Sequence, residues 1–230
     1  MIKSGLLIWI FISLIAMSEE MQAQDWANLN RFSDENVKLD PPAPGEKRVV
    51  FMGNSITEGW SQYSPGLFSG KPYINRGISG QTTPQMLIRF RADVIDLEPE
   101  VVIILAGTND IAGNTGPSSL EMIINNLVSM AELAKANDIK VILCSVLPAY
   151  DYPWSPGNNP DKKIPALNRM IKNYAENNGF IYLDYFSAMV DEQNGLKDEY
   201  TYDGVHPNEA GYKVMVPLVM NAIGKALNKN

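Results

Sequence analysis

The chain has 230 residues, enough for one compact domain with a sizeable core, and its formal net charge is −7. This acidic balance, without a cluster of lysine or arginine, disfavours nucleic acid and anionic membrane surfaces as partners. The single cysteine, Cys144, excludes an intramolecular disulfide framework, and its apolar surroundings in KVILCSVL predict a small buried side chain.

Residues 1–23 are typical of a secretory signal peptide. Lys3 precedes an apolar stretch over 6–16 that is too short to cross a bilayer as a helix. Cleavage after Ser18 and cleavage after Ala23 both remain open. We expect an exported periplasmic or extracellular protein with no stable membrane anchor, and the alternative is an uncleaved amphipathic anchor.

Residues 24–46 are polar and proline-rich, and we expect a lead-in to a folded domain over 47–230. From Lys47 onward, apolar runs alternate with amphipathic stretches. Uninterrupted apolar runs suit strands that are covered on both faces, as in a parallel sheet. The runs are RVVFMG, YINRG, EVVIILAG, KVILCSVLP and FIYLDYF. Their order predicts an α/β fold, a three-layer α/β/α sandwich with a flavodoxin-like parallel sheet of about five strands.

Several helices carry start or stop signals. Serine and threonine cap helix starts, glycine follows helix ends, and an internal proline kinks a helix. The signals are Thr83 followed by Pro84, Ser118 with Glu121 at capping-box spacing, Gly179 after the helix that follows the fourth strand, and Pro217 in the last helix, near 208–227.

Ser55 lies in GNSITEG, directly after the first predicted strand. Ligands of parallel α/β sheets gather at the carboxyl ends of the strands, so this loop is a candidate site. A serine at a strand-to-helix turn is also one of the commonest helix caps. Taken alone, the loop therefore fits either a nucleophile or an N-cap.

His206, in DGVHPNEAG before the last helix, is the only histidine of the chain. Any Ser-His hydrolase chemistry must use it. Asp203 lies three positions earlier, close enough for its carboxylate to orient the imidazole. The alternative is a surface turn, because both DG and HPN are favourable turn sequences.

Two further loops carry groups that suit an oxyanion. Asn109, in GTND after the third strand, can offer a side-chain amide, and Gly77, in NRGISG after the second, can offer a backbone N–H without a Cβ in the way. Asn and Gly are also ordinary turn residues, so each group alone is weak evidence.

The order of these elements is more informative than any of them singly. A serine after strand one, a glycine after strand two, an asparagine after strand three and Asp-x-x-His before the final helix resemble the four blocks of the SGNH, or GDSL, hydrolase family. The resemblance covers essentially all of residues 47–227. It implies Ser55 as nucleophile, His206 as base, Asp203 as its orienting partner, and Ser55, Gly77 and Asn109 as oxyanion donors.

One position departs from the family pattern, because the first block usually reads Gly-Asp-Ser and this chain has Asn54. The catalytic aspartate lies elsewhere, so we expect activity to survive. Asp110 is interpreted as a loop or cap carboxylate. Arg76 would pair with Glu58 or meet an anionic substrate. No metal and no cofactor is expected, since one histidine and one cysteine form no ligand cluster.

Aromatic residues near these loops suggest a substrate. Trp60 follows the nucleophile, and Tyr152 and Trp154 lie in the long loop after the fourth strand. Exposed rings there would stack on sugars, whereas packing within their own loop is the alternative. A small-molecule or glycan ester is therefore expected, most of all an O-acetylated carbohydrate. A lysophospholipase-like or platelet-activating-factor-acetylhydrolase-like enzyme and an inactive glycan-binding module are the competing hypotheses.

Overall fold

The computed structural model describes residues 25–228. The predicted signal peptide, residues 1–23, lies outside the described part of the chain. Between residues 25 and 228, no helix is both long enough and apolar enough to cross a membrane.

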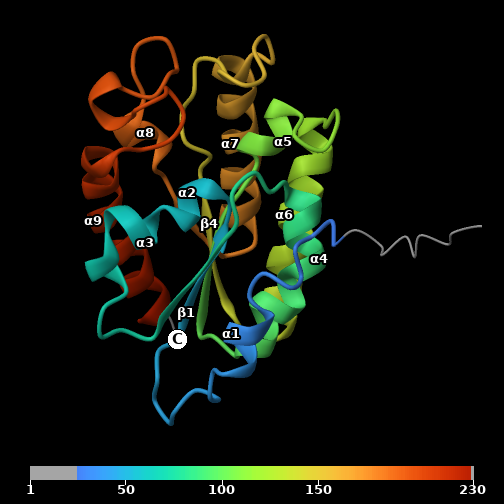
Figure 1. Cartoon of the computed structure of the whole chain (residues 1–230), viewed down its shortest axis with the longest axis vertical. Coiled ribbons are helices and arrows are strands. Elements are labelled where there is room, and N and C mark those ends of the chain that lie inside the picture. The colour runs from blue at the N-terminus through green and yellow to red at the C-terminus, as the bar shows by residue number, and fades with distance from the viewer. Residues whose placement is uncertain (1–24, 229–230) are drawn as a thin grey trace, which may run out of the picture.

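Five parallel strands form one sheet in the order β2-β1-β3-β4-β5, which confirms the predicted α/β class (Figure 1). The strands β1 and β3 occupy the middle of the sheet and are buried at every position. This burial explains why their sequences are apolar without alternation. The strands are β1 Val49–Gly53, β2 Tyr73–Gly77, β3 Val101–Leu105, β4 Lys140–Cys144 and β5 Ile181–Leu183.

Helices cover both faces of the sheet and make three layers. On one face, α4, α5, α6 and α7 pack on the inner side chains of the sheet, and on the other face α2, α3, α8 and α9 do so (Figure 1). Alternate residues of one strand serve the two layers, since Val50 and Met52 belong to the first core and Val49 and Phe51 to the second. The helices are α1 Ser33–Val37, α2 Ser55–Glu58, α3 Trp60–Tyr63, α4 Thr83–Asp93, α5 Thr108–Ala112, α6 Leu120–Ala136, α7 Pro160–Asn177, α8 Phe186–Met189 and α9 Glu209–Leu227, with short 3-10 turns at Pro65–Leu67, Ile95–Leu97 and Asp198–Tyr200.

The strand register brings three loops together at one edge of the sheet. Gly53, at the end of β1, is level with Gly77 of β2 on one side and with Leu105 of β3 on the other. The loops that follow these residues carry Ser55, the ISG part of NRGISG, and Asn109. Their meeting point is therefore fixed by the pairing of the three strands.

Two predicted helix starts are displaced by one residue. The capping box of α4 is made by Thr82 and Gln85, and α6 is capped by Ser119, whose Oγ accepts from the N–H of Met122 at 3.2 Å. In both cases the residue that caps the helix, Thr82 or Ser119, has the extended backbone conformation that a cap requires. Gly179 follows the end of α7 with φ +72°, as expected for a terminating glycine.

The N-terminal segment, residues 25–46, belongs to the folded unit, which differs from the expected start near Lys47. Ala27 and Phe32 are almost fully buried, and α1 lies within this segment. The guanidinium of Arg76 lies 4.5 Å from the centre of the Phe32 ring. An apolar residue in a polar, proline-rich stretch was the signal in the sequence that this segment packs against the domain.

Candidate active site

A groove of about 1250 Å³ opens at the carboxyl ends of the strands. Ser55, Asn109 and His206 line one part of it, with Trp154 on its rim. Residues of the N-terminal segment, among them Phe32, line another part. A single open groove is therefore lined by five of the predicted site residues, Ser55, Gly77, Asn109, Trp154 and His206, and it is large enough to hold a ligand beyond an acyl group.

Ser55 is the first residue of α2, and its neighbour Asn54 is the helix cap. The Asn54 Oδ1 accepts a hydrogen bond from the backbone N–H of Ile56 at 3.0 Å. This contact answers the question raised by GNSITEG, because the capping role falls to Asn54 and the Ser55 hydroxyl is left for another partner. That partner is His206, whose Nε2 lies 3.0 Å from the Ser55 Oγ.

His206 is held between Ser55 and Asp203. Its Nδ1 lies 2.7 Å from the Asp203 Oδ2. Because an ionised carboxylate can only accept, Nδ1 carries the proton and a neutral ring leaves Nε2 free to accept from the Ser55 hydroxyl. The second oxygen, Oδ1, accepts from the backbone N–H groups of His206 at 2.7 Å and Val205 at 3.0 Å.

Asp203 is maintained as a carboxylate by these donors. Partial burial alone would raise its pKa, but hydrogen bonds from the backbone and ring of His206 and from the N–H of Val205 outweigh burial and hold the pKa of Asp203 below its usual value. The turn itself is tied by Thr201, whose Oγ1 donates to the carbonyl of His206 at 2.7 Å and accepts from the N–H of Gly204 at 3.0 Å.

Asn109 lies almost fully buried at the start of α5. Its Nδ2 donates to the backbone carbonyl of Gln81 at 3.0 Å, and this bond fixes the plane of the amide. An amide nitrogen carries two hydrogens, so one N–H remains for a ligand in the groove.

Gly77 differs from its predicted role. Its N–H donates to the Asn75 Oδ1 at 2.9 Å and is thereby engaged. A Cβ at this position would lie 2.1 Å from the backbone nitrogen of Glu58, so glycine is required for β2 to approach α2. Gly80, the next glycine of NRGISG, lines the groove with φ +77°, and within residues 25–228 its N–H has no hydrogen-bond partner.

The described residues 51–214 match the model of the GDSL-like lipase/acylhydrolase family. The chain belongs to this family. The match contains every element of the geometry above, from the end of β1 to the turn before α9. The GDSL-family chain is therefore a carboxylic-ester hydrolase, as predicted from the order of its motifs.

The relatives of this GDSL-family chain include enzymes that act on carbohydrate. It is 29% identical to an acetylxylan esterase of Xylanibacter ruminicola, over 79% of this chain but only 44% of that protein. It is 26% identical to an acetylxylan esterase of Geobacillus stearothermophilus, over 78% of this chain and 94% of that protein. The crystal structure of a GDSL-like lipase from Bacteroides thetaiotaomicron matches with 51% identity and a TM-score of 0.85, over 87% of this chain and 98% of the other.

The prediction that Trp60 and Tyr152 bind substrate is wrong, because both side chains are buried. Trp60 is 1% exposed and packs against Phe51 and Tyr212. Tyr152 is fully buried, with its hydroxyl 2.9 Å from the Thr108 Oγ1. Trp60 faces the interior because aromatic rings pack against it there, and Tyr152 does so because its hydroxyl finds a hydrogen-bond partner there.

Trp154 is exposed beside the site of this GDSL-family esterase. Its ring centre lies 5.8 Å from that of His206, and its Nε1 donates to the Asn114 Oδ1 at 3.1 Å. Tyr202, which sequence analysis missed, is 62% exposed and also stacks on the His206 ring, with ring centres 5.8 Å apart. Its position next to Asp203 in the sequence was the available signal.

Two charged residues near the motifs have partners within the fold. Asp110 lies in α5 and accepts from the backbone N–H of Thr83, the first residue of α4, at 3.0 Å and from its hydroxyl at 2.6 Å, so its carboxylate is engaged at the start of α4 next to the cap residue Thr82. Burial raises the pKa of Asp110 despite these bonds. Arg76 pairs with Glu35 at 3.4 Å, whereas Glu58 accepts from the N–H and hydroxyl of Ser79.

Proposed function

We propose that this esterase removes O-acetyl groups from carbohydrate through an acyl-enzyme formed on Ser55. The observation that carries the proposal is the continuous chain of hydrogen bonds from Ser55 through His206 to Asp203. Its Ser55 end lies in a groove that is also lined by the aromatic residues Trp154 and Tyr202. Ser, His and Asp in this arrangement activate a hydroxyl for attack on an ester carbonyl.

In the first half of the reaction, the Ser55 Oγ attacks the acetyl carbonyl while the Nε2 of His206 takes its proton. Asp203 stabilises the imidazolium without taking the proton itself. The protonated imidazole then donates to the departing sugar oxygen, and the acetyl group remains on Ser55. In the second half, His206 takes a proton from water, the hydroxide attacks the acyl carbon, and acetate leaves as Ser55 regains its proton.

The tetrahedral intermediate places a negative charge where the carbonyl oxygen was, and donors for it must be in place beforehand. We assign the backbone N–H of Ser55 and the free amide hydrogen of Asn109 to this charge. Gly80 replaces Gly77 as the third donor, because the N–H of Gly77 is engaged by Asn75 and that of Gly80 is free within residues 25–228.

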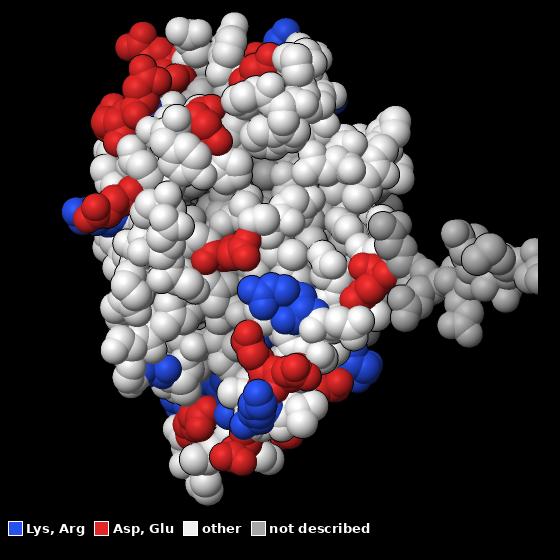
Figure 2. All heavy atoms as spheres, viewed as in Figure 1, with Lys and Arg blue, Asp and Glu red and all other residues white. Residues whose placement is uncertain are grey.

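The groove supports a sugar as the leaving group. Trp154 and Tyr202 expose flat rings beside His206, where the alcohol part of an ester would lie. On the face drawn in Figure 2, acidic and basic side chains alternate over the lower half and acidic side chains gather at the upper left, while the centre between them is largely uncharged. The relatives named acetylxylan esterases support the same substrate class.

Export of the enzyme stays part of the proposal. It rests on the signal-like sequence of residues 1–23, which lie outside the described residues. An exported location would place the enzyme where acetylated polysaccharides occur.

The test is the release of acetate from acetylated xylooligosaccharides, compared with the hydrolysis of acetyl and long-chain nitrophenyl esters, by wild type and Ser55→Ala. We expect acetate release that falls by about 10⁴-fold or more in the variant. Faster turnover of long acyl chains would support the lipid-esterase alternative. Absence of turnover in correctly folded wild type would support the glycan-binding alternative, and full turnover in Ser55→Ala would remove Ser55 from the mechanism.

A further inference from the structure

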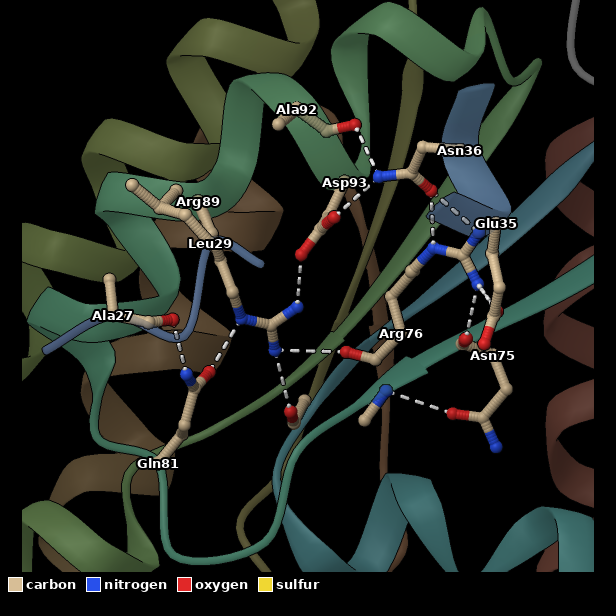
Figure 3. A network of polar contacts seen from close by, with 12 residues as sticks. Ala27, Leu29, Glu35, Asn36, Asn75, Arg76, Gln81, Arg89, Ala92 and Asp93 are labelled. Atoms are coloured by element: carbon tan, nitrogen blue, oxygen red, sulfur yellow. Dashed lines mark hydrogen bonds and ion pairs between the residues drawn. The ribbon is translucent and has the colours of Figure 1, made fainter. Parts of the chain in front are cut away.

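A buried polar network lies under the carboxyl ends of β1 and β2 (Figure 3). Its centre is Arg89 of α4, whose side chain is fully buried. The Arg89 Nη2 donates to the carbonyl of Gly53 at 3.1 Å and to that of Arg76 at 2.9 Å. Since Gly53 is two residues before Ser55, Arg89 holds together the two strand ends from which the active-site loops start.

The N-terminal segment closes this network at two points. Arg89 pairs with Asp93 at 2.9 Å, and Asp93 in turn accepts from the Nδ2 of Asn36 at 2.8 Å. On the other side, the Nε of Arg89 donates to the Gln81 Oε1 at 2.5 Å, and the Gln81 Nε2 donates to the carbonyl of Ala27 at 2.8 Å. Residues 25–37 therefore bond to Gln81 and Asp93, the two side chains that hold the fully buried Arg89.

Gln81 connects this network to the proposed oxyanion donors. Its side chain, which is 2% exposed, is held at both ends by Arg89 and Ala27. Its backbone carbonyl accepts the hydrogen bond that orients the Asn109 amide. Gly80 is the adjacent residue, so a displacement of Gln81 moves both proposed donors.

We infer that Gln81 is a positioning residue of the oxyanion hole, and that the N-terminal segment acts through it on the geometry of Asn109. The inference rests on the proposed function. A misplaced donor affects the transition state more than the bound ester, because the full negative charge exists only in the transition state. Loss of the two side-chain bonds should therefore lower kcat and leave KM nearly unchanged.

Gln85 provides a matched control. It also donates its Nε2 to a backbone carbonyl of the N-terminal segment, that of Trp26, at 2.6 Å. Its Oε1 accepts from the N–H of Thr82 at 3.0 Å, and no bond joins its side chain to Arg89 or Asn109 within residues 25–228. The two glutamines thus tie the same segment to the same region, but only Gln81 is linked to the proposed site.

The experiment compares Gln81→Met and Gln85→Met, which keep side-chain length and remove the amide. We measure kcat and KM with nitrophenyl acetate, the melting temperature, and the rate of covalent labelling by a fluorophosphonate, whose phosphoryl oxygen uses the same donors. For Gln81→Met we expect kcat and labelling to fall by about 10- to 100-fold, less than the loss of a whole donor, with KM within about threefold. For Gln85→Met we expect the melting temperature to fall about as much as in Gln81→Met. We expect its kcat to stay within about twofold of wild type.

A second comparison separates positioning from general loosening. In an Asn109→Ala background, Gln81→Met should lower kcat by a clearly smaller factor than in the wild-type background, because one of the two donors that Gln81 positions is absent. Equal and additive losses in both backgrounds would overturn the inference, as would an unchanged kcat for Gln81→Met in an enzyme that depends on Ser55. If Gln81→Met does not fold, Gln81→Asn, which is too short to reach both partners, is measured in the same way. A wild type that does not depend on Ser55 would instead contradict the proposed function.

Discussion

Asn54 and Ser55 are adjacent, and one caps α2 while the other contacts His206. Asn54 accepts the free N–H of Ile56 at the start of α2, and Ser55 keeps its hydroxyl for His206. The aspartate found here in most of the family would accept the same N–H through a carboxylate oxygen. The asparagine therefore preserves the capping function of the position without its charge.

This division predicts different outcomes for two substitutions of Asn54. Asn54→Asp should keep kcat/KM for nitrophenyl acetate within a few-fold, because the cap is retained. Asn54→Ala should lose about 1 kcal/mol of unfolding free energy and a larger share of activity, since the turn that presents Ser55 is loosened. Urea unfolding and steady-state kinetics measure both. Equal behaviour of the two variants would mean that the cap has no role in presenting Ser55.

The carboxylate of Asp203 predicts a pH dependence of stability. Its folded pKa is lowered by hydrogen bonds, so its contribution to stability is present above the unfolded pKa and is lost as the pH falls through the folded value. Wild type should be more stable than Asp203→Asn near pH 7, and the difference should shrink below about pH 4, where aspartate protonates in the unfolded chain. Unfolding curves at several pH values measure this difference. A gap that stays constant from pH 7 to pH 3 would contradict it.

Trp154 predicts a separation of substrates by size. Trp154→Ala should raise KM for an acetylated xylooligosaccharide by about tenfold, equivalent to roughly 1.4 kcal/mol of binding, and should leave KM for nitrophenyl acetate nearly unchanged. Tyr150→Ala is the matched control, because Tyr150 is also exposed but does not line the groove. Kinetics with both substrates tests the proposal, and equal effects of the two variants would contradict it.

At the scale of elements, the N-terminal segment behaves as part of the core. Phe32 is 5% exposed and lies under the guanidinium groups of Arg31 and Arg76. Phe32→Ala should lower the unfolding free energy by about 3 kcal/mol, through lost burial and the cavity left behind. Val37→Ala, at the other end of α1 from Phe32 and 87% exposed, should change it by less than about 0.5 kcal/mol. Chemical denaturation distinguishes the two, and similar values would mean that the segment is not anchored by Phe32.

The strands were predictable because a strand that is buried on both faces has an uninterrupted run of apolar residues, and such runs are visible in the sequence. The Ser55, Asp203 and His206 side chains were also predictable as neighbours, since one histidine and parallel strand ends leave few arrangements. Other features were not predictable in this way. Whether Trp60 and Tyr152 face the groove or the core depends on which helix face each occupies and on partners such as Tyr212 and Thr108, which are far away in the sequence.

The prediction of Gly77 as an oxyanion donor was made without the contacts that decide it. Gly77 ends β2, where its N–H is engaged by Asn75 and its Cα lies close to the backbone of Glu58, and the sequence shows neither contact. The packing of the N-terminal segment was hidden because its polar composition resembles a linker, although the same polar residues, Glu35 and Asn36, make its bonds to Arg76 and Asp93. Contacts between distant segments leave little trace in local composition.

At the scale of the molecule, stability comes from two apolar cores on either side of one parallel sheet, without disulfides. Cys144 lies at the end of β4 and is fully buried, and burial raises the pKa of its thiol. Labelling of the native enzyme by a thiol reagent should therefore follow the opening of the sheet and accelerate in parallel with unfolding in urea. Stopped-time labelling with mass detection measures it. Rapid labelling in native buffer would show that β4 opens independently of the rest of the domain.

The docking of the N-terminal segment also has a consequence for the order of events during biosynthesis. Asn36 leaves the ribosome first, but its partners Arg76 and Asp93 follow 40 and 57 residues later. Until α4 has been made, Asn36 lacks its partner Asp93, so the segment completes its docking only after β1, β2 and α4 have been synthesised. A fusion partner placed ahead of residue 25 would be attached directly to the segment that docks late. We therefore expect a short, polar linker between the two to favour the yield of active enzyme.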